Sequence, residues 1–359
     1  MRPAILWGFG SLGRALATAI GVSRRFDIVA VIDTDPSLVG RTVSDLVPAS
    51  RCDARVLATL DDYTDPRPVT LFHATTSDPS LVTTQILAAL AKGHSVITAA
   101  EWMFHPWLRY GDAAEALDAA ARAQATHVIG CGINPGFCFE ALPLLLSRTV
   151  HNVAAVDILR VADVSGIGPS DFGHVGLGLN EEAFRTQVAS HVIEGHMGFP
   201  ESIAAVAECL DLAVDRMTDH LVPTLATRPL QLSHREVSLG QVVGITQTAI
   251  GYVADAPVLR MTLEMFLDPA SYGRSPREVI DIRASRSFNL TVQPAAPPAE
   301  GAAAMMVYAA KMLPAMRSGL VSLLDLPIGE SRARLRVTDT HRSPQGTEFA
   351  IGERSSAPA

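Results

Sequence analysis

A carboxylate follows a strongly apolar run in HSVITAAEWMFHP, residues 94–106, and its surroundings suggest proton chemistry. Residues 95–99 have the character of a buried strand, and Glu101 then stands next to Trp102 and Phe104. Large apolar neighbours exclude water from a carboxylate and thereby raise its pKa. Such an acid can accept and return protons near neutral pH. The alternative is an acid in the first turn of a helix, which only stabilises the helix dipole.

A glycine-rich segment near the start of the chain, Gly8–Gly13, has the pattern G-x-G-x-x-G between an apolar strand and a helical pattern. The first glycine permits a tight turn, the second lets the backbone approach a pyrophosphate, and the third lets the helix pack on the strand. The helix N-terminus favours an anionic ligand. The segment predicts a dinucleotide site, although a structural glycine turn can have the same pattern.

Asp33 indicates which dinucleotide binds. It ends FDIVAVID, twenty residues after Gly13, where a carboxylate can accept hydrogen bonds from both hydroxyls of an adenosine ribose. A carboxylate repels the 2′-phosphate of NADP, and no Arg or Lys follows before Arg41. We therefore expect NAD, with NADP possible. The alternative is a turn residue within DTDP.

Polar residues at the ends of two further strands complete the predicted cofactor site. Thr75 and Thr76 end VTLFHATT, and Asn134 stands in the loop GCGINPGF, where it can meet the nicotinamide or the substrate. An ordinary turn would use the same Asn, Pro and Gly. The residues predicted to bind the cofactor are Gly8, Phe9, Gly10, Ser11, Leu12, Gly13, Asp33, Thr34, Thr75, Thr76 and Asn134.

The elements that position these residues alternate between apolar strands and helices through the first 150 residues. This alternation predicts an α/β fold with a Rossmann-type parallel sheet that is covered on both faces. Beyond residue 153 the pattern changes, with β-rich segments at 153–163, 236–253, 258–268 and 286–294. This predicts a second α+β domain on a mixed or antiparallel sheet. We expect a dinucleotide-binding domain over 1–140, completed by a returning helix over 303–328. A substrate and dimerisation domain would span 141–302, with a poorly ordered tail over 343–359.

Composition limits the partners of the chain. A formal net charge of −8 over 359 residues argues against nucleic acid and anionic membranes. The four cysteines form no C-x-x-C pair, which suggests reduced thiols in a cytoplasmic protein, and no Cys/His spacing predicts a metal site. The start lacks a signal-peptide pattern, and no apolar run is long enough to span a membrane.

Four segments carry a resemblance to a known family. GCGINPGF (130–137) is similar to the G-T-G-V-N-P-G-F loop of 2,4-diaminopentanoate dehydrogenases and native amine dehydrogenases, which belong to the dihydrodipicolinate-reductase-like group. AAEWMFHPW resembles their C-E-E-L-x-Y-P-W segment, and GHMGFPESI resembles their G-H-V-G-x-P-E-S-I run. KMLPAMRSGLVSLLDLP (311–327) resembles their closing helix and D-L-P turn. The resemblance spans residues 1 to about 328.

The resemblance implies oxidative deamination of a small amine, or the reverse reductive amination of a ketone or aldehyde with ammonia. It also implies a homodimer and places Glu101 on the family's catalytic carboxylate. Trp102 stands where the family often has a second acid, and Ala100 replaces a common cysteine. The bulky indole of Trp102 beside the acid argues against 2,4-diaminopentanoate itself and favours a smaller or monofunctional substrate. The lysine-rich and His-His signatures of dihydrodipicolinate reductases are absent.

Several residues are candidates for the substrate pocket, each with a structural alternative. His196 matches the Gly-His run but equally suits a histidine bonded beside a turn. Arg160, on a predicted strand, can meet a substrate carboxylate or form an ion pair. Aromatic and Met side chains can line a pocket or fill a core. The residues predicted to line the pocket are Trp102, Phe137, Phe139, Arg160, His196 and Met197, whereas His73 and His174 are interpreted as structural.

Two other functions remain open on the sequence. The first is another NAD(P)-dependent reductase on the same scaffold, acting on an imine, a semialdehyde or a 2,4-diaminopentanoate-type substrate. The second is a non-catalytic protein that senses NAD(H). A sensor would need a partner-binding or DNA-reading module, and the sequence shows none.

Overall fold

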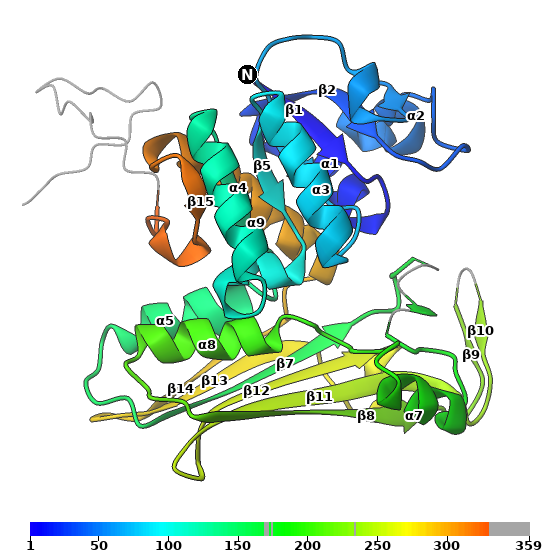
Figure 1. Ribbon diagram of the computed structural model, residues 1–359. Helices are drawn as coiled ribbons and strands as arrows, with labels where there is room; N and C mark the ends of the chain where they lie inside the picture. The colour runs from blue at the N-terminus through cyan, green and yellow to red at the C-terminus, as the bar shows by residue number, and fades with distance from the viewer. Residues whose placement is uncertain (169–171, 174, 233–234, 330–359) are drawn as a thin grey trace, which may run out of the picture. The chain divides into compact units, whose positions relative to one another are not determined.

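Two large sheets organise the part of the chain that the structure describes. The structure is a computed structural model, and it describes residues 1–168, 172–173, 175–232 and 235–329. Residues Met1–Leu326 form one compact unit. Within the described residues this unit contains a seven-stranded sheet, a six-stranded sheet and a two-stranded pair (Figure 1).

The seven-stranded sheet is parallel throughout and has the order β15-β6-β5-β4-β1-β2-β3. Its strands are β1 (Arg2–Trp7), β2 (Phe26–Ile32), β3 (Val56–Leu57), β4 (Thr70–His73), β5 (Ser95–Thr98), β6 (His127–Gly130) and β15 (Gly319–Val321). The central strands are apolar on both faces, as a parallel sheet between two helical layers requires. The predicted Rossmann-type sheet is confirmed.

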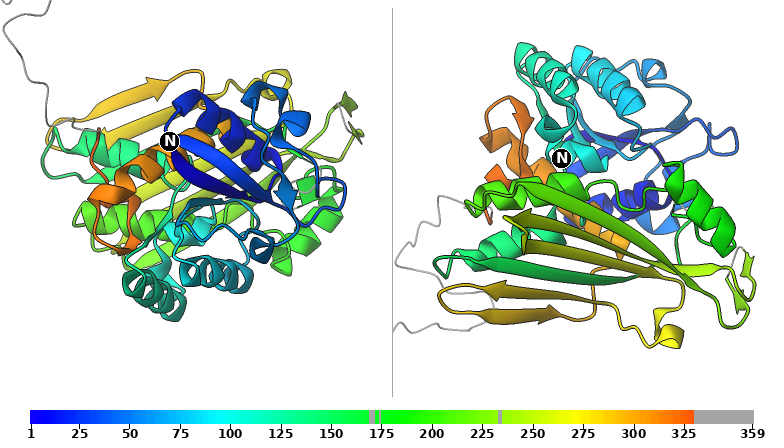
Figure 2. Two further views of the ribbon diagram at one scale, coloured as in Figure 1. Left: turned by 90° about the horizontal axis from the view of Figure 1, so that it is seen from above. Right: turned by 60° about the horizontal axis from the view of Figure 1, so that its bottom comes forward.

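Helices cover both faces of this sheet (Figures 1 and 2). Apolar residues of α1 (Ser11–Ser23) and α9 (Pro298–Met312) share one buried cluster with one face. Those of α3 (Pro79–Ala91) and α4 (Gly111–Ala123) share a second cluster with the other face. A short helix, α2 (Val43–Leu46), lies between β2 and β3 in the chain.

Local sequence signals predicted some helix boundaries correctly but not others. Asp78 caps α3, because its Oδ1 accepts a hydrogen bond of 2.8 Å from the Leu81 N–H, and Pro79 is the first helical residue. We expected one helix over 303–328. Instead Pro298 begins α9, the helix ends at Met312, and residues 319–321 form β15 beside β6.

The six-stranded sheet is mixed, in the order β14-β13-β7-β12-β11-β8. The pair β7–β12 is parallel and the other pairs are antiparallel. Helices α5 (Leu142–Ser147) and α8 (Phe199–Cys209) pack on one face, with α7 (Glu181–Ala189) further along (Figure 1). The strands are β7 (Ala155–Asp163), β8 (Arg216–Leu225), β11 (Val242–Val253), β12 (Ala256–Phe266), β13 (Arg277–Arg283) and β14 (Phe288–Val292), and the separate pair is β9 (Leu230–Gln231) with β10 (Glu236–Val237).

The fold class of the second domain was predicted, but not all of its strands. The sequence indicated β7, β11, β12 and β14 but not β8 or β13. Strand β8 lies at the edge of the sheet and carries Asp219, His220 and Pro223, which weaken a strand pattern. The predicted tail at 343–359 lies outside the described residues, as does His174.

Candidate active site

The glycine-rich segment forms a backbone cradle between β1 and α1. Gly8 has φ +96°, and a Cβ there would lie 2.3 Å from the Ala74 carbonyl oxygen. A Cβ on Gly13 would lie 2.2 Å from the Gly8 oxygen, so helix and strand meet closely. At Gly10 an added Cβ would meet no atom within 4 Å. Helix α1 begins with Ser11 and Leu12 and has no side-chain cap, so its N-terminus suits a pyrophosphate.

Asp33 follows β2 and holds this cradle. Its Oδ2 accepts a hydrogen bond of 2.6 Å from the Phe9 N–H, and its Oδ1 accepts one of 2.9 Å from the Asp35 N–H. The second bond is that of an Asx turn, so the two interpretations of Asp33 are compatible. Thr34 beside it is exposed. These residues fit the adenosine end of a dinucleotide, and their contacts with it stay predictions.

Thr75 and Thr76 follow β4 at the same edge of the sheet. Thr75 Oγ1 donates to Gln85 Oε1 at 2.7 Å and lies 3.0 Å from His73 Nε2, while Thr76 Oγ1 accepts from the Asp78 N–H at 3.1 Å. Burial lowers the pKa of His73 to about 4, so its ring is neutral near pH 7. This agrees with a structural role for His73.

The loop after β6 is brought against the Glu101 segment. Gly136 has φ +141°, and a Cβ there would lie 2.3 Å from the Gly132 oxygen, so the loop that carries Asn134 is tightly folded. A Cβ on Gly198 would lie 3.0 Å from Pro135 Cγ and 3.2 Å from Glu101 Cβ. Three segments that are distant in the sequence therefore meet at Gly198. Asn134 itself is half-buried.

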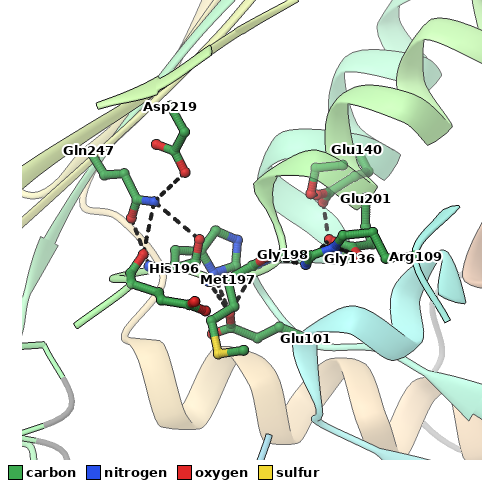
Figure 3. A network of polar contacts seen from close by, with 12 residues as sticks. Glu101, Arg109, Gly136, Glu140, His196, Met197, Gly198, Glu201, Asp219 and Gln247 are labelled. Atoms are coloured by element: carbon green, nitrogen blue, oxygen red, sulfur yellow. Dashed lines mark hydrogen bonds and ion pairs between the residues drawn. The ribbon is translucent and has the colours of Figure 1, made fainter. Parts of the chain in front are cut away.

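Glu101 is the first residue of a 3-10 helix, Glu101–Phe104, just beyond β5. Its Oε2 accepts hydrogen bonds from the N–H groups of Met197 at 2.6 Å and Gly198 at 3.2 Å (Figure 3). The same oxygen lies 3.1 Å from Nδ1 of His196. The side chain of Glu101 keeps 25% of its surface exposed, so it is neither buried nor in bulk solvent. Such contacts stabilise an ionised carboxylate and fix its position.

His196 is buried, and its backbone is bonded to the second sheet. Gln247 on β11 accepts from the His196 N–H at 2.7 Å and donates to Asp219 Oδ2 on β8 at 2.8 Å. Burial lowers the pKa of His196, but the charges of Glu101, Glu140 and Asp219 outweigh this and raise it. The charge of Glu101 thus stabilises the protonated form of the ring relative to a histidine in water. Both ring nitrogens are buried and neither has a hydrogen-bond partner among the described residues, so Nδ1 meets Glu101 as an ion pair.

The structure contradicts the prediction that Trp102 lines the pocket and that Trp102 and Phe104 shield Glu101 from water. Trp102 has no exposed surface, packs against Tyr110 with ring centroids 4.8 Å apart, and belongs to the cluster beneath α3 and α4. Phe104 points to the opposite side, into the cluster beneath α1 and α9. The 3-10 geometry directs both rings into the core, so they do not line a pocket or shield Glu101. Met197, His196 and Gly198 adjoin the carboxylate instead.

The structure also contradicts the prediction that Arg160 lines the substrate pocket. The side chain is buried on β7, where Nη1 forms an ion pair with Glu278 and Nη2 donates to the Ala296 oxygen at 2.7 Å. A guanidinium so committed is not available to a substrate carboxylate. The alternative interpretation, a structural ion pair, is the one that the structure favours.

The remaining predicted pocket residues differ in exposure. Phe139 is fully buried; its ring stacks on His196 at 6.4 Å and 25° and meets Phe199 edge-on at 5.2 Å. It is therefore a core residue that supports the imidazole. Phe137 and Met197 keep partial exposure, and their contact with a substrate stays a prediction.

A family model described as "2,4-diaminopentanoate dehydrogenase C-terminal domain" matches residues 137–340, more than half of the chain. The chain belongs to this family. The resemblance that the four segments suggested is confirmed. Family membership makes the chain an NAD(P)-dependent oxidoreductase that acts on CH–NH₂ groups.

Individual relatives of this family member cover nearly all of its length. A 2,4-diaminopentanoate dehydrogenase from Acetoanaerobium sticklandii is 24% identical over 328 residues, which are 90% of this chain and 93% of the relative. The structure of an amine dehydrogenase from Mycobacterium smegmatis has a TM-score of 0.81 at 19% identity, over 95% of this chain and 98% of its own. A putative myo-inositol dehydrogenase from Sinorhizobium meliloti has a TM-score of 0.51 at 12% identity, over 87% and 89%. These structures show the shared fold.

A second acid, Glu140, lies near the site and was not predicted from the sequence. Glu140 is fully buried, and its Oε2 accepts a hydrogen bond of 2.7 Å from the Gly136 N–H (Figure 3). Its Oε1 accepts a hydrogen bond from the Ser202 hydroxyl. Burial raises its pKa to about 7, although these two hydrogen bonds oppose the rise. The signal was present in the sequence, because Glu140 interrupts the apolar run FCFEALPLLL.

Two features of the described residues concern metals and membranes. They contain no group of three or more His, Cys, Asp or Glu side chains arranged to hold a metal ion. In the same part of the chain, every helix is too short or too polar to cross a bilayer.

Proposed function

We propose that this protein is an amine dehydrogenase that couples a small ketone or aldehyde with ammonia and NADH, and in reverse deaminates the corresponding amine. Glu101 carries the protons, and the protein works as a homodimer. The observation that carries the proposal is the convergence of Met197 N–H, Gly198 N–H and His196 on one oxygen of Glu101. It holds Glu101 just beyond the end of β5, at the same edge of the parallel sheet as the Gly8–Gly13 cradle that follows β1.

The cofactor fits the residues at the sheet edge. The Gly8–Gly13 cradle and the N-terminus of α1 would hold the pyrophosphate, and Asp33 would meet the ribose. When bound, the nicotinamide supplies or accepts the hydride. We favour NAD because Asp33 is a carboxylate, with NADP as the alternative.

Glu101 has two proton tasks in the direction of amination. Glu101 first accepts a proton from ammonium, and the ammonia so formed adds to the carbonyl carbon; transfer of one proton from the nitrogen to the oxygen gives the neutral carbinolamine. The protonated Glu101 then donates its proton to the carbinolamine hydroxyl group, which leaves as water and gives the iminium that accepts hydride. His196, in its imidazolium form, would hold the carboxylate charge in place between these steps. In deamination the same transfers run in reverse.

The charges near Glu101 favour a substrate without a carboxylate. Arg109 and Arg160 each pair with a buried glutamate, Glu201 and Glu278 respectively. Neither guanidinium is therefore free to bind a substrate carboxylate. We therefore expect a monofunctional ketone, aldehyde or amine in preference to 2,4-diaminopentanoate.

A panel of carbonyl compounds tests the proposal. Each ketone or aldehyde is assayed with ammonium and with NADH or NADPH, and each neutral ketone is matched with a keto acid of equal length. We expect oxidation of NADH that depends on ammonium and favours the neutral compounds. Reduction that proceeds equally well without ammonium would establish the rival reductase. Tight NADH binding without any turnover would favour the sensor.

A further inference from the structure

Glu201 is a buried acid that the reaction itself does not use. It lies in the first turn of α8, within the run GHMGFPESI, and has no exposed surface. Its carboxylate forms a two-pronged ion pair with Arg109: Nε to Oε1 is 2.7 Å and Nη2 to Oε2 is 2.8 Å. Arg109 comes eight residues after Glu101, so the pair links the Glu101 segment to α8.

Arg109 also reaches the residue that holds Glu101. Its Nη2 donates to the Met197 oxygen at 2.8 Å, while the Met197 N–H donates to Glu101 Oε2 at 2.6 Å. Met197 is thereby held on both sides of its Cα by residues of the 101–109 segment (Figure 3). A shift of Arg109 would move the N–H groups that orient Glu101.

We infer that Arg109 and Glu201 are positioning residues for Glu101: their ion pair fixes the Met197–Gly198 backbone whose N–H groups hold the carboxylate. The inference rests on the proposed function. A purely stabilising role is the competing explanation. It is weak, because a buried ion pair often contributes little net stability compared with a neutral pair of similar shape.

Single and double substitutions separate these explanations. Arg109→Gln leaves Glu201 buried without its cation and should lower the melting temperature and kcat together. The double variant R109Q/E201Q removes both charges and should recover most of the melting temperature. Glu208→Gln is the matched control, since Glu208 lies on the same helix with its side chain 75% exposed. Each variant is measured for thermal unfolding, for NADH affinity by fluorescence, and for ammonium-dependent turnover.

The double variant gives the decisive result. We expect its kcat to stay at least tenfold below wild type, with NADH affinity within threefold and the melting temperature near wild type. The Glu208→Gln control should match wild type in all three measurements. If kcat recovers in step with the melting temperature, the pair is only structural and the inference is overturned, although the proposed function stands. A wild-type protein without ammonium-dependent turnover would overturn both.

Discussion

At the scale of single residues, Glu101 is held by donors rather than by an apolar wall. The aromatic residues next to it in sequence turn into two separate cores. Two backbone N–H groups and the His196 ring meet its Oε2 instead. A carboxylate in this position keeps a fixed geometry and partial access to water, and both are useful to a group that must exchange protons during each turnover.

Glu140 should make the stability of the protein depend on pH. Because burial raises its pKa from 4.5 to about 7, the native state keeps a proton that the unfolded chain has lost in that interval. The free energy of unfolding therefore falls as pH rises from 4.5 to 7, by at most about 3 kcal/mol. In Glu140→Gln the amide can still bond Gly136 and Ser202 but does not titrate.

Urea unfolding of Glu140→Gln and wild type at pH 5 and pH 8 checks this. The free energy of unfolding of the variant minus that of wild type should be about 1–3 kcal/mol larger at pH 8 than at pH 5. Glu208→Gln, an exposed acid on α8, should show a much smaller difference between the two pH values. If Glu140→Gln changed the free energy of unfolding equally at pH 5 and pH 8, the raised pKa of Glu140 would be contradicted.

At the scale of elements, the turn from β1 into α1 assigns different tasks to its glycines. Gly13 has no room for a side chain because the Gly8 carbonyl is packed against it, whereas the space beside Gly10 is open on the protein side. The fold itself requires a glycine at Gly13. A glycine at Gly10 is needed only if a ligand approaches the backbone there.

Alanine should therefore lower stability at position 13 and weaken cofactor binding at position 10. Gly13→Ala should lower the free energy of unfolding by about 1–3 kcal/mol, because its Cβ would overlap backbone atoms. Gly10→Ala should leave thermal unfolding nearly unchanged but weaken NADH binding about tenfold or more. Thermal scans and NADH fluorescence titrations measure both. Wild-type NADH affinity in Gly10→Ala would contradict a pyrophosphate at this turn.

At the scale of the whole molecule, the sequence predicted the patterned elements and missed what depends on contacts between them. Alternating strands and helices and the Gly8–Gly13 fingerprint were enough for the parallel sheet. The edge strand β8 was missed because its polar residues do not alternate clearly, and Asp219 was missed with it. The pairs Arg109–Glu201 and Arg160–Glu278 join residues 92 and 118 positions apart, and no local pattern encodes such partners.

The central claim is that Glu101 transfers protons at a site where Met197, Gly198 and His196 hold it. The most direct test is ammonium-dependent NADH oxidation by Glu101→Gln, with Glu208→Gln as control and NADH affinity measured in parallel. We predict a loss of kcat of about 100-fold or more in Glu101→Gln, with NADH affinity within threefold of wild type and the control unaffected. Wild-type turnover in Glu101→Gln would contradict the account.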